Sequence, residues 1–112
     1  MLSRKVLAIA SLSTIVCSAA AVADEGLKAS QFLSHSAEGQ SGYITSSAMM
    51  AGLIAAQNKP EQAKCIDEFT ATQKVDGYPR IIDAMKQYGD YHPTAVILSV
   101  FQKACGSLKF MK

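Results

Sequence analysis

Residues His92–Gly106 read HPTAVILSVFQKACG, and this stretch decides the fold that we expect for the whole chain. Pro93 suits the first turn of a helix, because a backbone N–H at that position has no helical acceptor. Gly106 is typical of a helix end, because glycine enters the left-handed conformation at low cost. Apolar side chains recur between them at helical spacing, namely Ile97, Val100, Phe101, Ala104 and Cys105, and Leu108 continues the face. We predict an amphipathic helix ending in a cysteine, whose bonding partner decides the architecture.

Residues 1–23 have the pattern of a secretory signal peptide. Two basic residues precede an apolar run that ends in small residues, as a cleavage site requires. The run is short and holds several serine and threonine residues, so an uncleaved membrane anchor is a weaker alternative. Lipid attachment at Cys17 is disfavoured because Val16 precedes it. We expect cleavage between Ala23 and Asp24, and export to the periplasm.

The remaining residues, 24–112, are predicted to form one domain of balanced charge. Two of the 11 basic residues lie in the leader, which leaves 9 against 9 acidic residues. Proteins that bind nucleic acid carry a basic patch or stripe, and this part of the sequence has none. We therefore expect no nucleic-acid partner and, after cleavage, no membrane association.

Only two cysteines, Cys65 and Cys105, remain after the leader is removed. In a small exported chain such a pair favours one disulfide, because the compartment is oxidising. A metal pair would need further ligands, and His35 and His92 stand at no metal-binding spacing from the cysteines. Redox-active cysteines usually lie two positions apart. A structural disulfide should stabilise the chain by roughly 4 kcal/mol.

Proline and glycine divide the rest of the domain into helices, and no stretch alternates as a strand would. We expect a short helix over residues 29–33, a long one after Gly39 and one from Pro60. Residues 70–77 are expected to be a loop or a ragged helix end, and a further helix runs from Pro79 to a stop at Gly89. A short connection then leads into the last helix, which predicts that the last two helices are antiparallel neighbours. The predicted fold is a small all-α bundle of about four helices with one disulfide.

The long helix carries two apolar stripes side by side. The bulky stripe is Tyr43, Ser47, Met50 and Ile54, and the other is Ile44, Ala48, Ala51 and Ala55. We predict that both are buried in the core, with a dimer face as the alternative. Methionine also occurs on adaptable binding surfaces, but in a bundle we expect a core position for Met49, Met50, Met85 and Met111.

No spacing of residues indicates an active site. His92 reads as a helix cap, and neither it nor His35 has a nucleophile and an orienting acid nearby in the sequence. The carboxylates of Asp67, Glu68 and Asp83 are expected to be solvated. We expect no catalytic residue, no cofactor and no metal.

Several short elements follow one another in the mature chain: Gly42-Tyr43-Ile44, Cys65-Ile66, Ile81-Ile82, Pro93 and Ala104-Cys105. Their order resembles the Rap1a/Tai family of small exported proteins over roughly Phe32 to Leu108. The resemblance implies an all-α fold with a disulfide between Cys65 and Cys105. Characterised members of the family are periplasmic immunity proteins, often homodimers, which bind and block peptidoglycan amidase effectors delivered by type VI secretion.

The resemblance thus implies a non-enzymatic protein that binds a protein partner. The matched positions are structural, so it assigns no effector-binding residue. A second hypothesis is a periplasmic acid-stress chaperone similar to HdeA, because the balanced charge would become strongly positive when carboxylates are protonated. A third is an accessory subunit of an envelope assembly.

Overall fold

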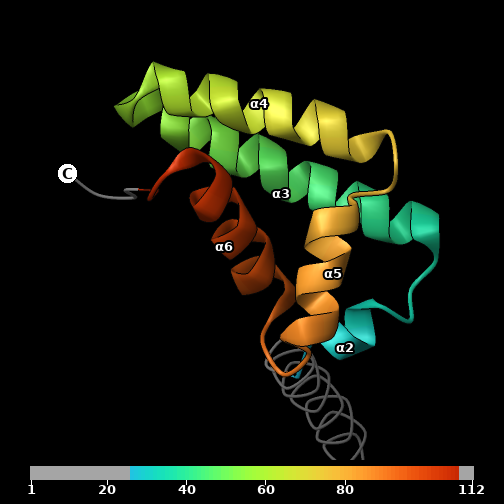
Figure 1. The fold of residues 1–112 in the computed structure, drawn as a ribbon. Helices are drawn as coiled ribbons and strands as arrows, with labels where there is room; N and C mark the ends of the chain where they lie inside the picture. Colours follow the sequence, from blue (N-terminus) through green and yellow to red (C-terminus); the bar gives the residue numbers. More distant parts are fainter. Residues whose placement is uncertain (1–25, 109–112) are drawn as a thin grey trace, which may run out of the picture.

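The computed structural model describes residues 26–108, which form helices and no strand. Helices α3 (Ala37–Asn58) and α4 (Pro60–Lys74) lie side by side, and α5 (Pro79–Gln87) and α6 (Pro93–Cys105) form a second pair that packs beneath them (Figure 1). The short α2 (Ala29–Phe32) contacts α5 and α6. The predicted all-α fold of about four main helices is confirmed.

Three helices begin at a proline, as the sequence predicts. Pro60, Pro79 and Pro93 are the first residues of α4, α5 and α6. His92 caps α6, because its Nδ1 accepts a hydrogen bond from the backbone N–H of Thr94 at 3.1 Å. At the other end of α6, Gly106 has φ 95° and ψ 164°, a backbone conformation that is essentially restricted to glycine.

Two predicted boundaries are wrong. Helix α3 begins at Ala37 and contains Gly39, because the Oγ of Ser36 accepts the backbone N–H of Gly39 at 3.1 Å and so stabilises the first turn. Helix α4 continues to Lys74, so the loop alternative for residues 70–77 is wrong up to that residue and the end of the helix lies there instead. Since α4 packs closely along α3, tertiary contact outweighs the weak local preference of its polar end.

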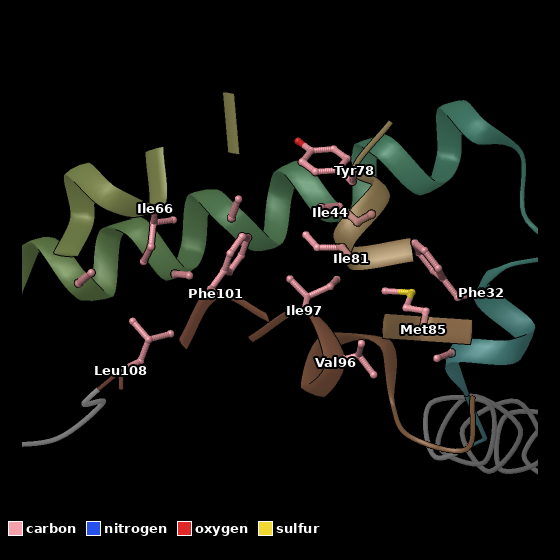
Figure 2. Packing of buried hydrophobic residues seen from close by; sticks show 14 residues of the cluster. Phe32, Ile44, Ile66, Tyr78, Ile81, Met85, Val96, Ile97, Phe101 and Leu108 are labelled. Carbon is pink, nitrogen blue, oxygen red and sulfur yellow. The ribbon is translucent and has the colours of Figure 1, made fainter. Parts of the chain in front are cut away.

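The core lies between the two helix pairs and extends to α2 (Figure 2). The largest fully buried side chains come from every described helix and from the loop before α5, and they are Tyr78, Phe32, Phe101, Ile44, Ile66, Ile81, Met85, Ile97 and Pro93. The rings of Phe69 and Phe101 meet edge to face with centroids 5.9 Å apart, which joins α4 to α6. One continuous core therefore serves all the described helices.

The buried face of α6 is rotated slightly from the prediction. Ile97 and Phe101 are fully buried as expected, and Val96 on the preceding flank is buried too. Val100, Ala104 and Cys105 are only partly buried. Val100 lines a groove between α6 and α5, which diverge from their shared loop (Figure 1), whereas Cys105 is bonded to Cys65 of α4.

Helix α2 is held against the α5–α6 loop by its own backbone. The N–H groups of Ala29 and Ser30 donate to the carbonyls of Tyr91 and Gly89, at 2.7 and 3.0 Å. A Cβ atom added at Gly89 would lie 3.3 Å from the Cβ of Ser30, so glycine permits this close approach. The sequence predicted Gly89 as the stop of α5, and Gly89 directly follows Tyr88, the C-cap of that helix. The close contact with Ser30 is a second role for this glycine.

Candidate protein-binding surface

Cys65 of α4 and Cys105 of α6 form a disulfide, with their Cα atoms 5.8 Å apart. The predicted pairing is confirmed, and the metal-pair alternative for these two cysteines is wrong. Within residues 26–108, no group of three or more His, Cys, Asp or Glu side chains could hold a metal ion. The disulfide joins the two helix pairs at one end of the molecule.

The side chain of Gln62 completes this junction, and sequence reasoning missed it. Gln62 is the one buried polar residue of the described chain, and its Nε2 donates to the carbonyls of Gly106 and Ser107 at 2.8 and 2.9 Å. A longer contact of 3.4 Å reaches the carbonyl of Cys105. The only hint in the sequence is its position one turn before Cys65 and Ile66, on the inner face of α4.

The residues weighed for chemistry do not come together. His92 serves as the cap of α6, and the ring of exposed His35 lies 5.8 Å from that of Phe32. Asp67 and Glu68 lie on α4 and Asp83 on α5, and all three are exposed. The described residues therefore offer no nucleophile paired with a base, and the expectation that no enzyme is present stays a prediction.

The most unusual surface is the outward face of α3. Met49, Met50 and Leu53 are 67%, 61% and 63% exposed, so the prediction that the bulky stripe is wholly buried is wrong at Met50. The core face is instead the smaller stripe, Ile44, Ala48, Ala51 and Ala55. Of the four methionines assigned to the core, only Met85 is buried, and Met111 lies outside the described residues.

This α3 face also lacks charge along its whole length. Residues 39–58 include no Asp, Glu, Lys, Arg or His. The α3 face consists of Gly42, Ser46, Met49, Met50, Leu53, Ala56 and Gln57, all exposed at helical spacing. A solvent-facing helix surface normally carries charged residues, and contiguous exposed apolar patches commonly mark sites of protein contact.

The leader predictions concern residues that are not described. The proposed cleavage site between Ala23 and Asp24 falls in residues 1–25, outside the described range. Among the described helices, none is both long enough and apolar enough to cross a membrane.

Comparisons of the chain with protein families, with curated proteins and with solved structures give no match.

Proposed function

We propose that this chain is an exported, non-enzymatic binding protein that contacts a protein partner through the α3 face. The observation that carries the proposal is the exposure of Met49, Met50 and Leu53 on a helix surface without charge. Burying such side chains against a partner removes apolar area from water, which is the main favourable term in protein association.

The chemistry of the α3 face favours a protein over other partners. It offers no cation for phosphate groups, which nucleic acids and anionic lipids require. Flexible methionine side chains adapt to the surface of a partner protein. Small residues at Gly42, Ser46 and Ala56 leave room for a partner's side chains or backbone to approach.

The specific form of the proposal is a periplasmic immunity protein that binds and blocks a peptidoglycan amidase effector of type VI secretion. This part rests on the resemblance of the Gly42-Tyr43-Ile44, Cys65-Ile66 and Ala104-Cys105 elements to the Rap1a/Tai family. The Cys65–Cys105 disulfide suits an oxidising compartment such as the periplasm. Blocking requires only contact, and hence no catalytic group on this chain.

Co-expression in the periplasm with candidate amidase effectors tests the proposal. We expect cells to survive effector expression and the two proteins to co-purify. Leu53→Lys and Met49→Lys should abolish both results, because a buried unpaired charge is costly, while leaving the thermal midpoint of the free protein unchanged. The matched control is Val75→Lys, at a residue that is 84% exposed, follows the end of α4 and is not part of the α3 face.

The other hypotheses correspond to distinct results. Loss of protection in Val75→Lys as well would contradict a specific α3 face. A dimer in sedimentation analysis that Leu53→Lys converts to a monomer, without any effector binding, would assign the face to a second copy. Suppression of client aggregation only at about pH 3, after loosening of the fold, would support the chaperone instead.

A further inference from the structure

A groove of about 690 Å³ runs between α5 and α6, separate from the α3 face. Its walls are one side of each helix together with the loop between them, and α3 contributes no residue to it. The two helices diverge from the loop (Figure 1), and the groove has a loop end and a far end. Its apolar floor is formed by Ala84, Val96 and Val100.

The far end of the groove is cationic. Arg80 in the first turn of α5 and Lys103 in the last turn of α6 both line it. The guanidinium of Arg80 lies 5.1 Å from the centroid of the Phe69 ring, which holds this charge in place. Within residues 26–108, neither cation pairs with a carboxylate. Two positive charges that form no ion pair with a described residue thus flank one end of the groove.

The loop end of the groove is lined by aromatic side chains. Tyr88 and Tyr91 are 49% and 61% exposed, and their rings meet edge to face with centroids 6.0 Å apart. Exposed aromatic rings of this kind are frequent anchors in protein interfaces. Asp83 lies about one turn from Arg80 along α5 and also lines the groove, so it disfavours a second anion in the middle.

The walls of the groove select the conformation of its occupant. An extended peptide needs partners for its backbone N–H and C=O groups, such as those at an exposed sheet edge. Helices α5 and α6 satisfy their backbone groups internally and offer only side chains. An α-helix satisfies its own backbone, so it can bind such a groove through side chains alone.

We propose that this groove binds an amphipathic helix of a partner protein, with an acidic side chain at the Arg80–Lys103 end and a bulky apolar side chain at the Tyr88–Tyr91 end. From Arg80 to Tyr88 the rise along α5 is about 12 Å. This rise corresponds to about eight positions, and a spacing of seven is the nearest one that keeps both side chains on the same face of a helix. The acidic and apolar residues of the partner helix should therefore lie about seven positions apart. The inference goes beyond the proposed function, because it assigns a second surface with different chemistry.

A set of stapled helical peptides tests this site on the oxidised protein purified from the periplasm. Each peptide carries Glu, Gln or Lys at one position and Leu or Ala seven positions away, in both chain directions. We expect the Glu–Leu peptide to bind about fivefold tighter than its Lys counterpart at low salt, and about tenfold tighter than its Ala counterpart. Amide shifts in nuclear magnetic resonance spectra should change at Gln87, Ser99 and Val100.

Variants separate this site from the α3 face. Arg80→Gln combined with Lys103→Gln should remove the preference for Glu over Lys, and Tyr91→Ala should weaken binding of every Leu peptide. The matched control Lys86→Gln, on α5 but outside the groove, should keep both preferences, and so should Leu53→Lys. Equal binding of the Glu, Gln and Lys peptides, binding by none of them, or shifts centred on Met49 and Leu53 would overturn the proposal.

Discussion

The side-chain amide of Gln62 donates to the carbonyls of Gly106 and Ser107. These carbonyls follow the end of α6, where no further helical turn supplies backbone N–H donors. Because Gln62 is only 6% exposed, no bulk water replaces it easily at this position. The positive φ of Gly106 turns the chain so that these carbonyls point toward α4. A single glutamine therefore satisfies the end of a helix that belongs to a different part of the sequence.

Replacing Gln62 by alanine should reduce the free energy of unfolding by about 2 kcal/mol, because two partly buried hydrogen bonds to the carbonyls of Gly106 and Ser107 are lost. Urea denaturation monitored by circular dichroism measures this change. The control is Gln57→Ala, an exposed glutamine of α3, for which we expect a change below about 0.5 kcal/mol. Equal effects of the two substitutions would show that the Gln62 hydrogen bonds contribute nothing to stability.

The role of Gln62 could not be predicted from the sequence, because it stands among charged residues at the start of α4. Its acceptors lie 44 and 45 positions away, and only the assembled fold brings them together. The role of Tyr78 could not be predicted from the sequence either. This residue has the left-handed φ of 61° and is fully buried. Its hydroxyl lies 2.7 Å from Oγ1 of Thr45. No local rule predicts a tyrosine in that conformation.

At the scale of helices, the contact between α4 and α6 depends on a covalent bond and a few side chains. The disulfide spans a sequence separation of 40 residues, and Gln62 and the Phe69–Phe101 ring pair lie on the same two helices. Because the disulfide restricts the conformations of the unfolded chain, it lowers the entropy of the unfolded state more than that of the native state.

Reduction of this disulfide should lower the free energy of unfolding by about 4 kcal/mol. Urea midpoints with and without a thiol reductant measure the effect. A Cys65→Ala, Cys105→Ala double variant should resemble the reduced protein and show no further response to reductant. Mass spectrometry gives the companion result, a loss of two hydrogens in the oxidised form, and an unchanged urea midpoint would contradict the prediction.

The starts of α4, α5 and α6 could be predicted, whereas the start and the exposed side of α3 could not. Pro60, Pro79 and Pro93 act locally, since each fits the first turn whatever surrounds it. Both stripes of α3 are apolar. The sequence therefore shows no difference in polarity that would decide which stripe faces α6. The structure buries the small stripe because alanines permit close approach of neighbouring helices, and this leaves Met50 outside.

Charge is confined to the surface over the whole described molecule. Every Asp, Glu, Lys and Arg within residues 26–108 is exposed, and none of them forms an ion pair with another described residue. Exposed charges contribute little to stability in any case. The fold is therefore held by its apolar core, its backbone hydrogen bonds and the disulfide.

The stability of the free protein should consequently be almost independent of salt. Between about 0.05 and about 0.5 M NaCl, a range that screens exposed charges strongly, we expect the free energy of unfolding to change by less than about 0.5 kcal/mol. Urea titrations at the two ionic strengths measure this. A fall of more than about 1 kcal/mol at high salt would mean that ion pairs stabilise the fold.

The separation of Cys65 from Cys105 also sets an order of events when the chain is made. Helices α3 and α4 are joined by Lys59 alone, so they can pair as soon as both have emerged. The disulfide cannot form until the residues up to Cys105 have followed, which include all of α5 and α6. Any cell that makes this protein must therefore keep the thiol of Cys65 unpaired, and away from wrong partners, until α6 arrives.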